Sequence, residues 1–184
     1  YLVRHPQIVP AEKKEVHFFD LQFRQGVDWY REQFPRIGKS LSQESVVEEE
    51  NKLINGFICG EASPYYIFHP LVPQRIYQLF PEIKLIVLLR NPVERAISHY
   101  HHEVKMGFEY LPFEEAIAQE EFRLKGEVEK MLENKDYYSF NHQHYTYLSR
   151  GIYINQITNW MSIFPKEQFL IIKSEEFYNH PDLI

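Results

Sequence analysis

Two stretches of the sequence carry side chains that could bind a phosphate or move a proton. In the first, the apolar run 85–89 ends in Arg90, and Ser98 follows about two helical turns later. The planar guanidinium of arginine matches a phosphate better than a lysine ammonium does, and a serine hydroxyl can donate to the same group. The spacing fits equally well a surface arginine that pairs with a nearby carboxylate, followed by an ordinary helical serine.

In the second stretch, EVHFFD, Glu15 and His17 stand two residues apart and therefore on the same side of an extended segment. Apolar neighbours such as Phe18 can raise the pKa of a carboxylate, and such a group can take a proton from a hydroxyl or an amine. Glu15 is therefore a candidate base, and His17 an assisting or orienting group. From the residues alone the favoured interpretation is structural: a surface glutamate before a strand, and a histidine that fills a polar gap in the core.

Histidine-rich stretches at 99–103 and 142–144 raise the question of a metal. On a helix, His99 and His102 would share a face with Glu103, which makes a possible set of ligands. Clustered histidines are also common on protein surfaces, and we predict no metal site. The tyrosine-rich stretch 136–151 is predicted to pack either as a loop over the site or as a satellite core.

The elements that must position these residues alternate between strands and helices. Apolar runs without alternation predict strands covered on both faces, as in a parallel sheet, and they lie at 16–19, 57–59, 84–89 and 169–173. Helices are predicted at 26–34 and 71–80, along the apolar stripes 93–104 and 154–164, and over the charged stretch 113–132. The acidic stretch 43–52 is predicted as a solvated loop. This order predicts an α/β fold with right-handed crossovers.

The helix that follows Arg90 has a well-specified start. Asn91 is a good N-cap, Pro92 suits the first helical position, and Glu94 stands where a capping box needs a carboxylate. The turn lies at the carboxyl end of a buried strand, where open α/β sheets bind ligands. Because the free amides and the dipole of a helix start favour an anion, the sequence predicts that a negatively charged group binds here.

Composition limits the classes of protein to which the chain can belong. Its 184 residues suit one domain with a substantial core, and contents of 44% hydrophobic and 16% aromatic residues favour a globular fold. The net charge of −6 gives no basic field for nucleic acid. The single Cys59 excludes an internal disulfide and fits a reducing compartment, and no apolar window is long enough to span a bilayer. We expect a cytoplasmic protein.

The stretch RNPVERAISHY resembles the 3′-phosphate-binding segment of sulfotransferases that use 3′-phosphoadenosine-5′-phosphosulfate (PAPS). The pattern of that family is Arg-x-Pro-x-x-Arg-x-x-Ser-x-Tyr, and every fixed position is met between Arg90 and Tyr100. The resemblance implies that Arg90 and Ser98 contact the 3′-phosphate of this co-substrate, and that the reaction needs no metal. It also implies a three-layer, P-loop-NTPase-like α/β domain with a central, mainly parallel sheet flanked by helices.

Upstream, EVHFF resembles the Glu-x-His/Gln-Phe-Phe segment of heparan-sulfate-type sulfotransferases and related bacterial enzymes, whose glutamate is the catalytic base. A Gly-x-x-Trp-Tyr helix that ends in proline follows, as it does in that family. The resemblance implies that Glu15 is the base and that His17 assists it. GEASPYY at 60–66 is similar to the Glu-Lys-Thr/Ser-Pro-x-Tyr segment near the acceptor, but Ala62 stands where many members have lysine, which argues against a glycan acceptor.

The resemblance covers nearly the whole chain, so we expect residues 1–184 to form a single sulfotransferase domain that is truncated at both ends. No Gly-Thr-Thr segment and no complete Gly-x-x-x-x-Gly-Lys-Ser/Thr loop is present to cradle the 5′-phosphosulfate. We therefore expect this stretch alone to be inactive. The implied activity is transfer of a sulfuryl group from PAPS to a hydroxyl or an amine of an acceptor, with Glu15 as general base.

Two other functions stay open. A degenerate, non-catalytic domain that binds a nucleotide or a partner would also lack the phosphate loop. A small-molecule kinase would share the sheet, but it needs a magnesium-binding carboxylate at a strand end, where this chain has Arg90. Because an acidic chain suits a long polyanionic glycan poorly, we expect a small-molecule, lipid or neutral saccharide acceptor. The expected setting is bacterial or cytosolic, or the Golgi lumen for a eukaryotic homologue.

Overall fold

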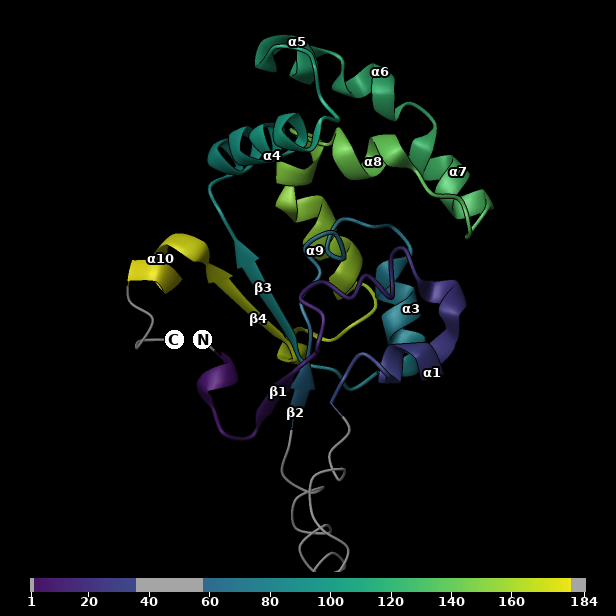
Figure 1. Cartoon of the computed structure of the whole chain (residues 1–184), viewed down its shortest axis with the longest axis vertical. Helices are drawn as coiled ribbons and strands as arrows, with labels where there is room; N and C mark the ends of the chain where they lie inside the picture. The colour runs from purple at the N-terminus through teal and green to yellow at the C-terminus, as the bar shows by residue number, and fades with distance from the viewer. Residues whose placement is uncertain (1, 36–57, 180–184) are drawn as a thin grey trace, which may run out of the picture. The chain divides into compact units, whose positions relative to one another are not determined.

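The computed structural model describes residues 2–35 and 58–179. It divides into two compact units, Tyr1–Tyr66 and Ile67–Ile184, and each is described by itself. The strands of both units are paired in parallel and accompanied by helices (Figure 1), which confirms the predicted α/β class. The predicted loop 43–52, and a Gly-Lys-Ser triplet at 38–40, lie outside the described residues.

Within residues 2–35 and 58–66, the first unit holds one pair of parallel strands and one short helix. Strand β1 (Ile8–Pro10) lies beside β2 (Ile58–Gly60), with Ile8 opposite Ile58. The described residues of this unit also form two 3-10 helices, η1 (Leu2–Arg4) and η2 (Phe23–Gln25). The helix α1 (Gly26–Arg31) directly follows η2. The strand and the helix predicted at 57–59 and 26–34 are therefore present, with ends shifted by a few residues.

The predicted strand at 16–19 is wrong. Its apolar side chains are buried, as expected, and Phe18 is fully enclosed, but the backbone turns instead of extending. His17 has a φ of 54°, and its carbonyl accepts from the amide of Gln22 at 2.9 Å. The ring of Tyr30 stacks on Phe18 with 4.5 Å between centroids. The apolar run thus builds a compact aromatic core rather than one strand of a sheet.

The second unit is built on another parallel pair. Strand β3 (Leu85–Leu89) lies beside β4 (Phe169–Lys173), in register from Leu85 opposite Phe169 to Leu89 opposite Lys173, and both match predicted strands. The helical elements of this unit are α3 (Val72–Leu79), α4 (Pro92–Met106), α5 (Phe113–Ala118), α6 (Glu120–Leu124), α7 (Glu127–Glu133), α8 (Phe140–His144), η3 (Ser149–Gly151), α9 (Tyr153–Met161), η4 (Lys166–Gln168) and α10 (Ser174–Asn179). Figure 1 shows α4 following the carboxyl end of β3, with α5 to α8 gathered near it.

The charged stretch 113–132 forms three short helices, not the single exposed helix that was predicted. Gly126, with a left-handed φ of 76°, separates α6 from α7. Glu120 is only 5% exposed, because its carboxylate accepts from the amides of Leu148 at 2.6 Å and Ser149 at 2.8 Å. A charge pattern does not reveal which glutamates will bind another segment, so the breaks in this stretch were missed.

Helix α4 begins with the predicted N-cap, but the predicted capping box is wrong, because Glu94 pairs with Arg90 and the Asn91 amide donates to Glu175. The side-chain oxygen of Asn91 accepts from the amides of Val93 at 3.0 Å and Glu94 at 3.3 Å, which is the N-cap that the sequence indicated. At the other end Gly107 adopts a φ of 74°, a left-handed conformation that costs glycine little. Both ends of the helix are therefore fixed by local chemistry.

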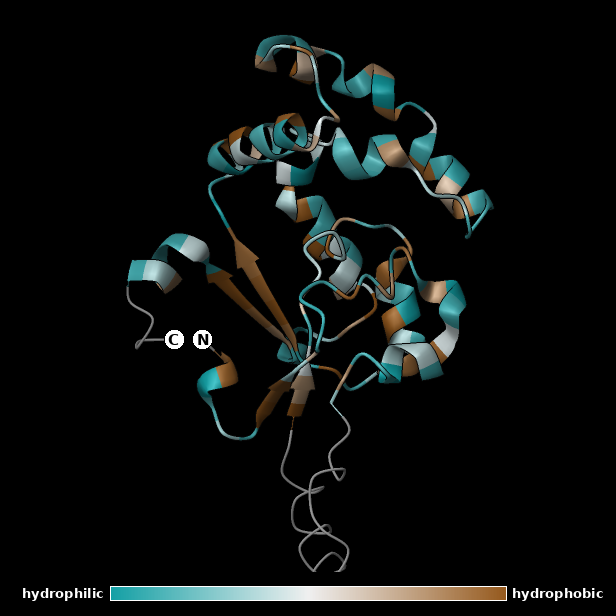
Figure 2. Ribbon diagram, viewed as in Figure 1, coloured by the Kyte–Doolittle hydropathy of each residue, from teal (hydrophilic) through white to brown (hydrophobic). Residues whose placement is uncertain are grey.

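The apolar stripes of α4 and α9 are only partly buried. Val93 and Ile154 remain 65% and 68% exposed, and Figure 2 shows hydrophobic residues along α4, β3 and β4. Helix α4 packs instead through Ala96, which forms a core cluster with Ala116 and Tyr147. Periodicity thus predicted the helices but not the face that each one buries. Among the described residues, no helix combines the length and the apolar character that crossing a membrane requires.

Candidate functional site

The first predicted pair lies together in the first unit, in a row of three side chains. His17 Nε2 is 3.3 Å from Glu15 Oε2, and His17 Nδ1 is 2.8 Å from Asp20 Oδ2. The Asp20 side chain is fully buried, whereas that of Glu15 is 40% exposed. The imidazole therefore joins an enclosed carboxylate to one that a second molecule can reach.

Asp20 was not predicted as a site residue. It closes the same EVHFFD stretch, and the turn at His17 is what brings it back to the imidazole. An extended strand would have placed the two side chains on opposite faces. An acidic residue at the end of a buried apolar run was the signal that could have indicated it.

The charge on His17 is controlled mainly by this neighbour. The hydrogen bond to Asp20 raises the pKa of His17, burial acts in the opposite direction, and the carboxylate of Glu15 adds a smaller upward effect. Since a histidine takes part in proton transfer in the neutral pH range, an imidazole held between two carboxylates can both orient Glu15 and share its proton. The arrangement suits general acid–base chemistry.

The second predicted pair lies in the second unit. Arg90 directly follows β3 and is exposed, and its Nη2 is 3.1 Å from Glu94 Oε2. Ser98 is exposed on α4. Both the predicted helix start and the alternative of a local ion pair are thus present. Because an exposed pair of this spacing is worth little, a doubly charged phosphate could replace Glu94 as the partner of Arg90.

The strand-to-helix turn that presents Arg90 is held from two sides. Tyr153 on α9 donates its hydroxyl to the Arg90 carbonyl at 2.9 Å. The amide of Asn91 donates to Glu175 Oε1 at 2.8 Å, and this hydrogen bond lowers the pKa of the Glu175 carboxyl. A carboxylate thus already lies at this helix start, in keeping with its preference for anions. The guanidinium of Arg90 and the hydroxyl of Ser98 are exposed donors on this strand end and helix.

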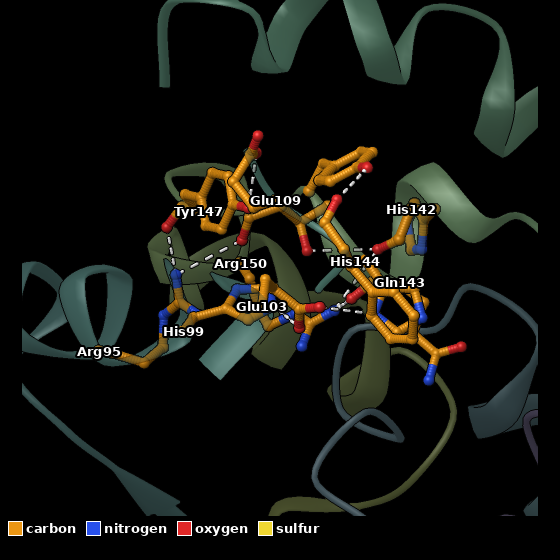
Figure 3. Close-up of polar contacts among 12 residues, drawn as sticks. Arg95, His99, Glu103, Glu109, His142, Gln143, His144, Tyr147 and Arg150 are labelled. Carbon is orange, nitrogen blue, oxygen red and sulfur yellow. Dashed lines mark hydrogen bonds and ion pairs between the residues drawn. The ribbon is translucent and has the colours of Figure 1, made fainter. Parts of the chain in front are cut away.

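The inner side of α4 carries a polar cluster, shown in Figure 3. Glu103, 3% exposed, lies 3.0 Å from His99 Nε2 on its own helix and 2.9 Å from His144 Nδ1 on α8. Burial acts to raise the pKa of Glu103, but the hydrogen bonds from the two imidazoles outweigh it and lower that pKa to about 2. The cluster ties α8 to the helix that bears Ser98.

The histidines considered as metal ligands fall into different places. His99 is paired with Glu103, whereas His102 is exposed on α4. In residues 2–35 and 58–179, no three His, Cys, Asp or Glu side chains gather as a metal would require. The possible ligand set of His99, His102 and Glu103 is therefore not assembled among these residues.

The second arginine of the RNPVER motif, Arg95, braces the tyrosine-rich stretch. It donates to the carbonyl oxygens of Tyr147 and Thr146, and burial lowers the pKa of its guanidinium. Tyr147 is fully buried and donates its hydroxyl to Glu109 at 3.0 Å. Of the two alternatives for residues 136–151, the core interpretation holds for Tyr147.

Comparison with known proteins shows the family to which the chain belongs. The sequence model described as "Sulfotransferase domain" matches residues 6–182. The chain therefore belongs to the sulfotransferase-domain family. Among solved structures, a sulfotransferase from Alicyclobacillus acidocaldarius shares 32% sequence identity with a TM-score of 0.65, and the match covers 98% of this chain and 68% of that one. This likeness confirms the P-loop-like α/β fold that the sequence resemblance implied.

Curated relatives agree with the family. The membrane-associated sulfotransferase kil1 of Dictyostelium discoideum is 26% identical over 249 residues, covering 100% of this chain and 50% of the relative. Heparan sulfate glucosamine 3-O-sulfotransferase 5 of Homo sapiens is 28% identical over 190 residues, covering 96% and 43%. The chain thus spans half or less of the length of these relatives.

Proposed function

We propose that the protein containing this chain transfers a sulfuryl group from PAPS to a hydroxyl or an amine of an acceptor. Family membership supports the reaction class. The observation that carries the proposal is the row Glu15–His17–Asp20, in which an accessible carboxylate is held by an imidazole that a buried carboxylate anchors. Such a row is suited to accept the proton that the acceptor must lose.

In the proposed reaction, Glu15 accepts the proton of the acceptor hydroxyl while the acceptor oxygen forms a bond to sulfur. The bond between sulfur and the bridging phosphate oxygen breaks, and adenosine 3′,5′-bisphosphate leaves with the electron pair. His17 orients Glu15 and stabilises its charge, and Asp20 fixes the ring by accepting at Nδ1. Sulfuryl transfer, like phosphoryl transfer, depends mainly on positioning and on charge stabilisation.

Arg90 and Ser98 are proposed to bind the 3′-phosphate of the donor. The guanidinium supplies a fork of donors at the start of α4, and the exposed Ser98 hydroxyl lies on the same helix. The guanidinium of Arg90 donates to the carboxylate of Glu94 in this structure. The two proposed donor-binding side chains thus come from the strand end and from the second turn of one helix.

For the acceptor we propose a hydroxylated small molecule, a lipid or a saccharide without long runs of negative charge. Several relatives are named for heparan sulfate, a saccharide acceptor. The net charge of −6 of this chain and the alanine at position 62 argue against an equally anionic polymer. The relatives therefore support a saccharide as the class of acceptor, whereas the charge of this chain argues against a highly anionic saccharide.

The test is a transfer assay on the full-length protein with sulfur-labelled PAPS and a panel of sugars, lipids and phenols. Glu15→Gln should lower kcat by roughly a hundredfold or more, the usual contribution of a general base. Glu12→Gln is the matched control, since Glu12 is exposed on the same segment. Binding of adenosine 3′,5′-bisphosphate without transfer to any acceptor would favour a non-catalytic nucleotide-binding domain instead.

A further inference from the structure

Glu61 is the centre of a second polar cluster in the first unit. Its carboxylate accepts from three hydroxyl groups: Ser63 Oγ at 2.9 Å, Tyr66 at 2.8 Å and Tyr30 at 3.4 Å. Burial raises the pKa of Glu61, while these three hydrogen bonds act to lower it. The sequence resemblance pointed to residues 60–66 as a segment near the acceptor, whereas here its polar side chains are engaged with the protein itself.

Two of the three hydroxyls also hold the backbone beside the candidate base. The amide of His17 donates to Ser63 Oγ at 3.1 Å. The amides of Phe18 and Phe19 donate to the hydroxyl of Tyr66 at 2.8 and 3.3 Å. Ser63 and Tyr66 therefore each link one carboxylate oxygen of Glu61 to the turn that carries His17.

This turn needs support. His17 has a φ of 54°, a left-handed conformation that few residues other than glycine adopt without compensation. The amides of His17 and Phe18 donate to these hydroxyls and would lose those hydrogen bonds if both hydroxyls turned away. Because a buried donor without a partner is costly, the turn depends on hydroxyls that keep their lone pairs available to it.

The ionised form of Glu61 enforces that direction. An ionised carboxylate can only accept hydrogen bonds, whereas a hydroxyl can donate one and also accept. Facing Glu61, Ser63 and Tyr66 must donate toward the carboxylate, which leaves their oxygen lone pairs for the backbone amides. A neutral group with its own N–H or O–H at this position would compete for the same lone pairs.

We propose that Glu61 is a positioning residue for the catalytic pair, acting through Ser63 and Tyr66 on the backbone of residues 17–19 and so on the orientation of His17 toward Glu15. The expected effect on kcat rests on the proposed function, whereas the expected effect on the orientation of His17 does not.

Glu61 is not a competing candidate for the base. Its Oε1 accepts from two tyrosines and its Oε2 from Ser63. Burial raises the pKa of Glu61 overall, but three hydroxyl donors already occupy both oxygens of this half-buried carboxylate and leave little room for an acceptor hydroxyl. Glu15, in contrast, has an exposed side chain and His17 as its hydrogen-bonding partner. The two glutamates therefore have separate roles.

The test compares Tyr66→Phe, Tyr30→Phe and Glu61→Gln in the full-length protein. Tyr66→Phe removes the acceptor for two backbone amides, whereas Tyr30→Phe removes a long contact to Glu61. We expect kcat to fall about tenfold or more for Tyr66→Phe, a part of the factor that a well-placed base supplies. The decrease should be smaller for Tyr30→Phe and intermediate for Glu61→Gln. The KM for PAPS should stay within about twofold in all three, since the change concerns proton transfer rather than donor binding.

A second measurement does not depend on activity. Titration of the His17 ring by NMR should show its pKa displaced in Tyr66→Phe and Glu61→Gln, because the contacts with Asp20 and Glu15 are disturbed. If Tyr66→Phe does not fold, Ser63→Ala takes its place. An unchanged His17 titration, or equal losses of kcat in Tyr66→Phe and Tyr30→Phe, overturns the inference. A wild-type protein without transfer activity but with the displaced titration in the variants contradicts the proposed function alone.

Discussion

Asp20 Oδ2 lies 2.8 Å from His17 Nδ1, and the Asp20 side chain is completely enclosed by the protein. The left-handed turn at His17 makes this contact between residues three apart in the chain. The contact fixes which ring nitrogen faces the core and which faces Glu15. The position of the candidate base therefore depends on Asp20, a buried residue that no acceptor would touch.

Replacement of Asp20 by Asn should lower both the pKa of His17 and kcat. The Asp20 hydrogen bond is the largest cause of the raised His17 pKa, so NMR titration should find a lower value in Asp20→Asn. The pair stabilises the fold in full below the unfolded imidazole pKa of about 6.5, and that contribution is lost as pH rises through the folded pKa. A pKa of His17 that is the same in both proteins would rule out this coupling.

Glu103 should make the second unit sensitive to acid. Its pKa of about 2 lies below the value of 4.5 for a free glutamate, so its stabilising contribution is present above pH 4.5 and is lost as pH falls toward 2. Glu103→Gln should destabilise the protein at pH 7 by about 3 kcal/mol at most. The difference from wild type should shrink by pH 3, as measured by urea unfolding. A constant difference across that range would contradict the assignment.

His142 should contribute in the opposite sense at mildly acid pH. Its ring, 3% exposed, stacks on Phe68 at 4.4 Å, and burial lowers the pKa of His142 to about 4. Below pH 6.5 the unfolded chain takes up this proton first, so stability should fall by about 2 kcal/mol between pH 7 and pH 5. His142→Gln should lose less stability over the same interval in urea titrations, and an equal loss would refute the prediction.

Glu94→Gln should strengthen donor binding slightly. Glu94 holds Arg90 through an exposed ion pair, which is worth no more than about 1 kcal/mol. Release of Arg90 and removal of a negative charge should therefore raise the affinity for adenosine 3′,5′-bisphosphate by up to about fivefold. Weaker binding by this variant would mean that Glu94 orients Arg90 instead of competing for it.

Much of the fold followed from local chemistry that the sequence displays. Asn91 and Pro92 specified the start of α4, and the apolar runs at 84–89 and 169–173 became β3 and β4. The run at 16–19 was buried but not extended, because hydroxyls from residues 63 and 66 satisfy its amides where a neighbouring strand would otherwise do so. Hydrophobicity predicts burial better than it predicts the partner of each backbone amide.

The candidate site was predicted in part. Glu15 and His17 do lie in contact, Arg90 lies at the start of α4 and Ser98 on its second turn, but their roles in catalysis and donor binding stay predictions. Asp20 and Glu61 were missed as supporting residues, since both act through contacts that exist only after the turn at His17 forms. Residues that touch a ligand leave motifs, whereas residues that hold them in place depend on the tertiary fold.

The most direct test of the account is a calorimetric titration of adenosine 3′,5′-bisphosphate into the full-length protein and two arginine variants. Arg31 is the matched control, because it forms a similar exposed pair with Asp28 on α1. Arg90→Gln should weaken binding by about tenfold or more, the loss expected for hydrogen bonds to a charged group, while Arg31→Gln should bind like wild type. Equal affinity of Arg90→Gln and wild type would contradict the assignment of this strand end as the donor phosphate site.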